Sequence, residues 1–267
     1  MLEFAWSVVR SGFRSRSFQS VMVVGLFLVG VAFLAASFSP RSPKTVALDV
    51  GLSGIRFALV LFALFWVQDF VSREIDRKTI FHSLSYPVSR LEYLCGRLAG
   101  IVMLLAVVVV GLGFLLQIAV LAAGGQYEQE WAPNLGLPYW TALLGLWLSV
   151  AVVTAVAFLV ASLSTISGLP FVAGAAFAIA SQSVGPVADY LTRGADGQEE
   201  LVHRYGPIIQ FIRWVLPDLS RLDWRVWPMY GVQPAAQEMM YACMLALAYF
   251  TLIFFGAVLM FRRRDFL

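Results

Sequence analysis

The sequence predicts an all-α membrane protein with six transmembrane helices, an N-terminal interfacial amphipathic helix and a cytoplasmic helical hairpin. Three observations lead to this fold class. First, 60% of the 267 residues are hydrophobic and only 13% are charged, whereas about a quarter of the residues in a soluble domain carry charge. Second, six apolar runs are long enough to cross a bilayer core, which needs about 20 residues. Third, the charged residues are concentrated between those runs.

The N-terminal segment, residues 1–18, predicts an amphipathic helix that lies in the membrane interface. Leu2, Trp6, Val9 and Phe13 recur at helical spacing, and the arginines of this segment fall on another side. The first span follows it. A cleaved signal peptide is the alternative, because basic residues precede the apolar run. That run of 18 residues exceeds the usual apolar region of a signal peptide and favours a retained helix.

The six spans are placed by counting apolar residues, and each ends where charge or a polar turn interrupts the run. They cover about 21–38, 52–70, 98–123, 139–163, 169–190 and 239–261. The second span carries Arg56 near its first turn. The fourth begins with Tyr139 and Trp140, and aromatic residues of this kind prefer the membrane–water interface.

Residues 68–97 form the most densely charged stretch of the chain and predict a helical hairpin. Proline disfavours helical geometry in the residue before it, so Pro87 ends the first helix of the hairpin. Ser89 and Glu92 then form a capping box for a second helix, which continues into the third span. Acidic residues four positions before basic residues support the first helix.

Six spans place both termini on one side of the membrane, and basic residues identify that side as the cytoplasm. The N-terminal segment, the hairpin and the C-terminal end together hold 11 of the 19 Lys and Arg residues. The first loop on the other side holds only Arg41 and Lys44, and the second holds none. The hairpin is therefore predicted to be cytoplasmic, and the long loop at 192–237 extracytoplasmic.

The long loop contains an apolar stretch, 207–217, that is too short to span a membrane. An interfacial or re-entrant helix is the favoured interpretation, with Trp214, Trp224 and Trp227 at the depth of the lipid headgroups. A soluble lid over an exit is the alternative.

Motifs for common catalytic chemistry are absent from the sequence. No GxxxxGK[ST] phosphate-binding loop occurs, and the residues before Lys78 and Thr79 include no glycine. No HExxH or GxSxG motif occurs either, and the two histidines and two cysteines are too scattered to form a metal cluster. We expect no catalytic residue, no metal site and no cofactor bound by this chain.

Arg56 is the clearest ionisable residue within a span. A charge at the bilayer centre costs about 2.5–3.5 kcal/mol on insertion scales, so such a residue is a candidate for function. Arg56 either extends its charge to the interface or takes part in gating or substrate binding. Gln117 and Gln182 are expected to form hydrogen bonds between helices.

Small residues are concentrated in the fifth span, and small residues let membrane helices approach closely. Four of them are predicted to form a dimer interface or pathway: Gly174, Ala178, Ser181 and Gly185. Packing within the bundle is the alternative.

At this point the chain resembles the permease subunits of ABC-2-type transporters. The resemblance rests on the segment after the second span, REIDRKTIFHSLSYPVSRLEYLCGRLAG. Its matching positions are Glu74, Arg77, Thr79, Pro87 to Arg90, and Gly96 with Arg97. The stretches VLPDLSRLD (215–223) and FRRRDF (261–266) also resemble the family. Arg77 and Lys78 depart from the family pattern, in which a glycine commonly precedes the threonine. The layout is also similar to permeases that serve maturation of nitrous-oxide reductase, but no residue cluster here indicates copper handling.

The resemblance implies a single transmembrane domain, 1–267, that forms a dimer in the bacterial cytoplasmic (inner) membrane. Its first and fifth helices line the dimer interface. Two ABC ATPase subunits bind ATP and Mg and dock on the cytoplasmic side, and no nucleic acid is involved. The hairpin is the coupling helix that contacts the ATPase. Its expected contact residues are Glu74, Asp76, Arg77, Lys78, Thr79 and Ile80. The resulting function is export by a permease that has no ATP-binding motif of its own.

Alternatives from other classes stay open. A stand-alone secondary transporter or channel usually has polar residues along its spans and internal repeats, and here only scattered glutamines and no clear repeat occur. A lipid-modifying enzyme needs clustered acids with a base or metal set. A mechanotransmitting subunit that couples to an ATPase and moves no solute fits the sequence equally well.

Overall fold

The computed structural model describes residues 2–39, 41–69, 90–123, 132–164, 166, 168–192, 205–208, 211–212 and 215–263, and within them all regular secondary structure is helical. The long helices are α1 (Leu2–Arg14), α2 (Arg16–Ser37), α3 (Pro43–Val67), α6 (Arg90–Ala122), α7 (Leu137–Leu163), α8 (Leu169–Thr192) and α11 (Ala236–Arg263). The short ones are η3 (Leu219–Leu222) and α10 (Val226–Tyr230). All the long helices except α1 are long and apolar enough to cross a membrane, so the all-α class and the six predicted spans are confirmed.

The helices extend beyond the apolar runs that predicted them. α3 begins at Pro43 rather than near residue 52. α6 runs without a break from Arg90 to Ala122, which at 1.5 Å per residue is about 50 Å, compared with about 30 Å for the hydrocarbon core. Counting apolar residues detects only the part of a helix that lies in the hydrocarbon core. The helix itself continues into polar surroundings, because its backbone hydrogen bonds do not depend on apolar side chains. The second helix of the predicted hairpin is thus continuous with the third span from Arg90 onward.

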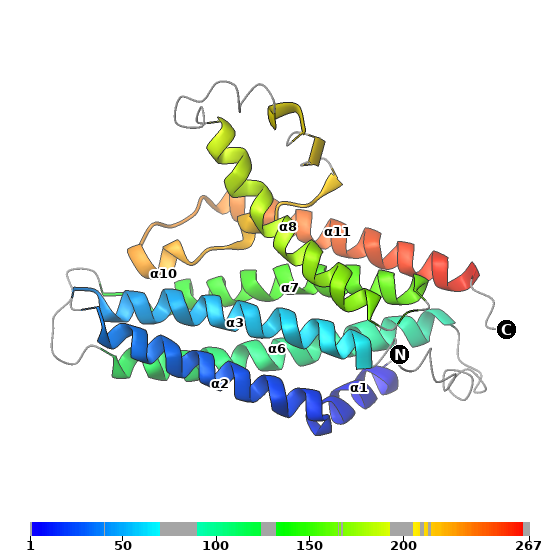
Figure 1. Cartoon of the computed structure of the whole chain (residues 1–267), viewed down its shortest axis with the longest axis horizontal. Coiled ribbons are helices and arrows are strands. Elements are labelled where there is room, and N and C mark those ends of the chain that lie inside the picture. The colour runs from blue at the N-terminus through cyan, green and yellow to red at the C-terminus, as the bar shows by residue number, and fades with distance from the viewer. Residues whose placement is uncertain are drawn as a thin grey trace.

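α3 and α7 form the centre of the bundle (Figure 1). α3 packs against α2, α6, α7 and α8, and α7 packs against α3, α6, α8 and α11. The largest buried side chains of the two helices include Phe62, Trp66 and Phe158. α8 crosses the other helices obliquely, and its C-terminal end projects away from the bundle (Figure 1). α2, α8 and α11 carry exposed apolar side chains along their length, as expected of helices that face lipid or another chain.

α1 packs against α6 through a different side from the one that its apolar spacing indicates. Val8 is fully buried, and a side chain at Gly12 would overlap Leu104 of α6. Trp6 and Phe13 belong to the predicted apolar face, and they are 66% and 41% exposed. α1 therefore contacts the bundle through the side that carries Val8 and Gly12. Trp6 and Phe13 stay exposed, as the membrane interface predicted for this helix requires.

The part of the long loop that follows residue 214 folds into the bundle. Leu219 and Leu222 of η3 are buried, and so is Trp224. A Cβ at Gly145 of α7 would overlap the carbonyl oxygen of Leu222, so the glycine lets the loop backbone lie directly on α7. The Trp224 ring is buried and lies beside this glycine of α7, and its predicted headgroup depth stays a prediction. Trp214 lies outside the described residues, and Trp227 is partly exposed.

Gly145→Ala is expected to displace η3 from α7. The added methyl group must occupy the position of a backbone oxygen, and overpacking of this kind costs about 1–3 kcal/mol. Gly111→Ala on α6 is the matched control, because nothing lies within 4 Å of its Cβ position. Thermal unfolding of the purified variants in detergent measures the difference. Equal melting temperatures for the two variants would contradict the close approach at Gly145.

Candidate functional site

Arg56 lies in the middle of α3 and binds an anion from the long loop. Its Nη2 atom is 2.7 Å from Oδ2 of Asp223, and Nη1 donates a 3.4 Å hydrogen bond to Oε1 of Gln182 on α8. Arg56 lies about 20 Å along the axis from the first residue of α3, at 1.5 Å per residue. Its side chain is 19% exposed and contacts protein groups instead of extending toward the membrane interface.

Arg225 binds the same carboxylate from the opposite side. Its Nε donates to Oδ1 of Asp223 at 2.8 Å, and its Nη1 is 2.9 Å from Oδ1 of Asp49. Nη1 also donates to the Ser53 hydroxyl at 2.8 Å. Asp49, Ser53 and Arg56 are spaced by four and three residues, so they share one face of α3. We call Asp49, Arg56, Asp223 and Arg225 the ion-pair cluster.

The ion-pair cluster is electrically balanced, with two carboxylates and two guanidinium groups. Burial by itself disfavours the charge of Asp223, but hydrogen bonds from Arg225 and the charge of Arg56 outweigh it and hold the pKa of Asp223 below its usual 3.8. Burial also opposes the charge of Arg225, and the bonds to Asp223 and Asp49 outweigh it and raise the pKa of Arg225. Because the pKa of Asp223 is lowered on folding, its contribution to stability is complete above about pH 4 and is lost as the pH falls through the folded value.

Gln182 connects the ion-pair cluster to α7. Its amide accepts from Arg56 and its Nε2 donates to the Ser149 hydroxyl of α7 at 3.0 Å. The predicted interhelical role of Gln182 is confirmed. Gln117 donates to the carbonyl oxygen of Leu135, just before α7, at 3.5 Å. Polar groups of three helices thus meet at one level of the bundle.

η3 is held between α7 and α8 by the first acidic residue of the VLPDLSRLD stretch. Asp218 caps η3, because its Oδ1 accepts from the backbone N–H and the hydroxyl of Ser220. A Cβ at Gly185 of α8 would overlap the Ser220 hydroxyl, so α8 approaches η3 as closely as α7 does. Arg221 pairs with Asp218 at 3.2 Å on the exposed side. The stretch therefore holds one acid that shapes the loop and a second, Asp223, that binds the arginines.

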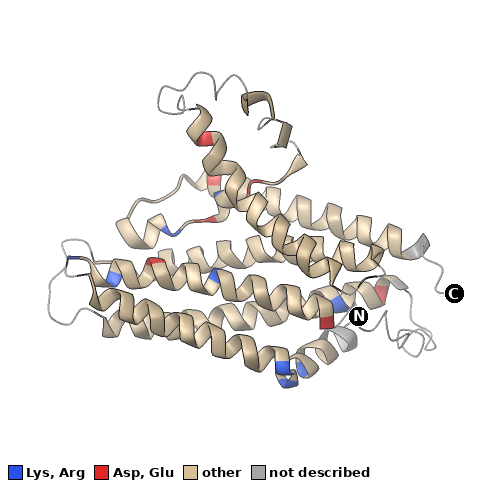
Figure 2. Ribbon diagram, in the orientation of Figure 1, with Lys and Arg blue, Asp and Glu red and all other residues tan. Residues whose placement is uncertain are grey.

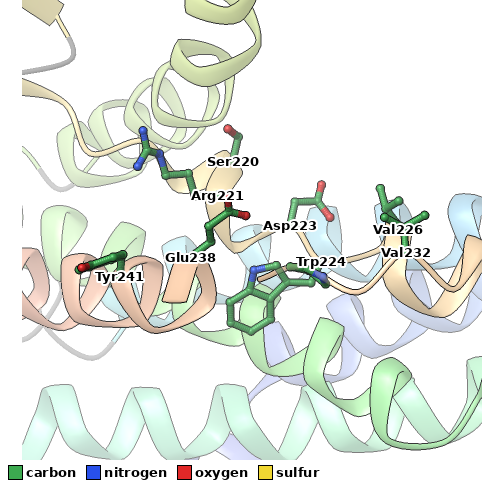
Figure 3. Close-up of a pocket in the computed structure, with 9 residues that line it drawn as sticks. Ser220, Arg221, Asp223, Trp224, Val226, Val232, Glu238 and Tyr241 are labelled. Carbon is green, nitrogen blue, oxygen red and sulfur yellow. The ribbon is translucent and has the colours of Figure 1, made fainter. Parts of the chain in front are cut away.

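Two cavities lie beside the ion-pair cluster. The first has a volume of about 500 Å³ and lies between the loop and the start of α11, lined by Asp223, Trp224, Glu238 and Tyr241 among others (Figure 3). The second has a volume of about 420 Å³ and lies between α3, α7 and α8, with Arg56 in its wall. We call this second cavity the α3–α8 groove. Asp223 and Arg56 pair with each other, so one ion pair lies between the two cavities.

The four small residues predicted to form a dimer interface are all buried against the chain's own elements. Gly174 lies against Leu64 of α3, and Gly185 against η3. Ala178 is 8% exposed and Ser181 is fully buried. Packing within the bundle, the alternative left open by the sequence, accounts for all four. A second copy would meet α8 on its exposed side, which carries Val172, Ile179, Val187 and Tyr190.

The predicted coupling residues lie outside the described residues. These are Glu74, Asp76, Arg77, Lys78, Thr79 and Ile80. The structure supplies the helix that follows them. Within it, Arg97 is buried and its guanidinium lies 5.3 Å from the ring centre of Tyr93.

Sequence reasoning identified Arg56 but not the residues that bind it. An arginine within a span requires a counter-ion, and Asp49, the partner of Arg225 in the same cluster, lies on the same helical face two turns before Arg56, which was a usable signal. Asp223 and Arg225 are far from α3 in the sequence, and no local pattern links them to it. Ser149 carries no signal at all, because single serines are common in membrane helices.

Asp223→Asn is expected to lower the free energy of unfolding by about 3 kcal/mol, because it leaves two buried guanidinium groups without their shared anion. Asp189→Asn is the control, since Asp189 is exposed on α8 and surface changes stay within about 0.5 kcal/mol. Combining Asp223→Asn with Arg56→Gln should cost less than the sum of the two single changes. Chemical unfolding of the purified protein measures these values. Strict additivity would show that the two side chains do not interact.

Comparison with known proteins connects this architecture to a family. The profile described as ABC-2 family transporter protein matches residues 9–266, which is nearly the whole chain. No curated protein matches the sequence. The match includes all six membrane helices, the ion-pair cluster and the charged segment after α3. The chain therefore belongs to the ABC-2 family of transporter membrane proteins.

Proposed function

We propose that two copies of this chain form an export pathway that is driven by separate ATPase subunits. The observation that carries this proposal is the family match over residues 9–266, taken with a sequence that has no phosphate-binding loop. A transporter membrane protein with no ATP-binding motif needs ATP and Mg to act on a partner chain. Family membership supports association with an ABC ATPase, and we infer two copies of each subunit.

The distribution of charge supports an orientation with both termini in the cytoplasm of a bacterial inner membrane. Charged residues are found mainly near the ends of the helices and around η3 and α10, with long uncharged stretches between (Figure 2). The described ends of the chain, α1 and the last turn of α11, lie at the same end of the bundle (Figure 1). That end carries the basic residues Arg10, Arg14 and Arg16, as the positive-inside rule requires of a cytoplasmic face.

Coupling in this proposal runs through α6. Movement of the ATPase displaces the segment 68–97, and the continuous helix from Arg90 carries that displacement along the bundle. α6 packs against α3 and α7, which hold Arg56 and Ser149 of the polar level described above. A long helix packed on the two central helices transmits force better than a broken one, because its backbone hydrogen bonds are uninterrupted.

The segment 215–235 would close the pathway on the outer side. It is fixed to α3 by two ion pairs and by the hydrogen bond from Arg225 to Ser53, and it lies close against α7 at Gly145 and against α8 at Gly185. Release of solute on that side then requires these contacts to loosen. Arg56 would act in gating through its bond to Asp223, which is one of the alternatives that the sequence left open for it.

The double change Glu74→Ala with Arg77→Ala is expected to uncouple the ATPase. It removes two charges from the proposed contact and should reduce co-purification of the ATPase by tenfold or more, about 1.4 kcal/mol, without lowering the melting temperature of the bundle. Glu128→Ala with Glu130→Ala is the control, because these acids belong to a loop on the opposite side. Solute-stimulated ATP hydrolysis, measured once a solute is known, separates export from mechanotransmission. Unchanged co-purification and hydrolysis in the double variant would overturn the coupling role.

The orientation is tested with single cysteines at two exposed glutamines. Gln19 lies near the start of α2 and Gln237 near the start of α11, so the proposal places them on opposite sides. With Cys95 and Cys243 replaced by alanine, a membrane-impermeant maleimide applied to intact cells should label Gln237→Cys and leave Gln19→Cys unlabelled. The reverse pattern would invert the orientation.

A further inference from the structure

The α3–α8 groove has a polar end and an apolar end. Its polar end is lined by Ser53, Arg56, Ser149, Gln182 and Ser183, and its apolar end by Val60, Leu61, Leu64, Val153, Phe171 and Ala175. Antiparallel α3 and α8 bring these groups together, since Phe65 of α3 lies 5.2 Å from Phe171 of α8 at one end and Arg56 meets Gln182 at the other. The apolar part extends about 12 Å from Arg56 to Leu64 at 1.5 Å per residue.

Among the described residues, Arg56 is the only ionisable one in the wall of this groove; the other polar groups there are three serine hydroxyls and one amide. Asp223, its partner, lines the other cavity. A molecule in the groove therefore meets the guanidinium of Arg56, which Asp223 pairs from the other cavity, and neutral hydrogen-bonding groups at one end. It meets hydrocarbon side chains along the rest. That combination complements a negatively charged or strongly accepting headgroup joined to an apolar chain.

The groove opens sideways, into the region that lipid occupies. Phe57 and Ile179 line it and are 57% and 71% exposed. Both belong to helices that are able to cross a membrane. In the orientation proposed above, the polar end faces outward and the apolar end points toward the cytoplasm, which is how a lipid of the outer leaflet is oriented.

We propose that the α3–α8 groove binds a membrane amphiphile with an anionic headgroup, its head at Arg56 and Gln182 and one apolar chain along α3 and α8. This inference rests on the proposed export function and gives its solute a chemical class. It commits to an amphiphile that enters from the bilayer. A second copy of the chain would bring apolar side chains to the groove and would leave the serines and the amide at its polar end without an added partner.

The test uses two photoactivatable probes that share one alkyl chain. One is a diazirine fatty acid, which is anionic, and the other is a diazirine monoacylglycerol, which has no charged group. The full chain, with its ATPase where that co-purifies, is reconstituted in phosphatidylcholine nanodiscs and irradiated with each probe. Peptide mass spectrometry then maps the adducts. We expect adducts on residues 57–64 and 171–179, with the fatty acid labelling about tenfold more, the difference made by one charge-assisted hydrogen bond.

Ala175→Phe blocks the apolar end without touching the ion-pair cluster, because Ala175 lines the groove. Its matched control is Ala176→Phe, on the exposed neighbouring position of α8 and outside the groove lining. We expect labelling to fall at least tenfold in Ala175→Phe and to stay unchanged in Ala176→Phe. Arg56→Gln should remove the preference for the anionic probe, and Arg56→Lys should retain most of it. If Arg56→Gln does not fold, the alanine pair decides the proposal.

Three results would overturn the inference. They are equal labelling of both phenylalanine variants, adducts that map elsewhere, and a chain-to-chain crosslink from a photoactivatable residue placed at Ile179. ATPase co-purification separates this inference from the proposed function, because Ala175→Phe lies far from the charged segment and leaves that partner bound. Absence of groove labelling in the unsubstituted chain, with the ATPase bound, overturns the amphiphile alone. Specific labelling with no ATPase partner overturns the export function alone.

Discussion

The bond between Arg56 and Asp223 is the constraint on which the rest of this structure depends. A guanidinium in the middle of a membrane helix has no water to solvate it, so an anion must be brought to it. The anion comes from the long loop, at 2.7 Å. For the loop to reach that depth, it must pack closely on two helices. Gly145 leaves space for the loop backbone on α7, and Gly185 leaves space for the Ser220 and Asp218 side chains on α8. One charge in α3 thus explains why the segment 215–235 folds into the bundle.

The ion-pair cluster also illustrates how a bilayer protein keeps charge without a net field. Two acids and two arginines cancel, and each guanidinium is bound by more than one acceptor. Such an arrangement is stable only while all its members stay together, because removal of any one leaves an unpaired charge in a low-dielectric setting. In the proposed closure, the ion pairs would stay formed while the helices are at rest. They would break when a helix that carries one of the four residues moves. α3, α8 and the loop each carry part of it, so a displacement of any of them acts on the same site.

α8 uses two sides for two purposes. Its small residues face α3, α7 and η3, where they allow close packing within the chain. Its apolar exposed side and the α3–α8 groove remain for lipid, a second copy or a solute. The polar level formed by Arg56, Gln182 and Ser149 separates the groove from the loop cavity. A pathway between the two would therefore have to pass the ion-pair cluster, so the proposed closure and the proposed amphiphile site would lie next to each other.

The sequence by itself determined the six spans, the hairpin helix that continues into α6, and the family, because these depend on local composition and on motifs read along the chain. It also identified Arg56 as a candidate for function within a span and Gln182 as a residue that forms hydrogen bonds between helices. It left the use of the small residues on α8 open and did not indicate that Trp224 packs against α7. Only the tertiary structure decided these points and supplied Asp223 and Arg225, whose ion pairs with α3 join residues more than 150 positions apart. A periodic pattern shows which face of a helix is special but not what that face contacts.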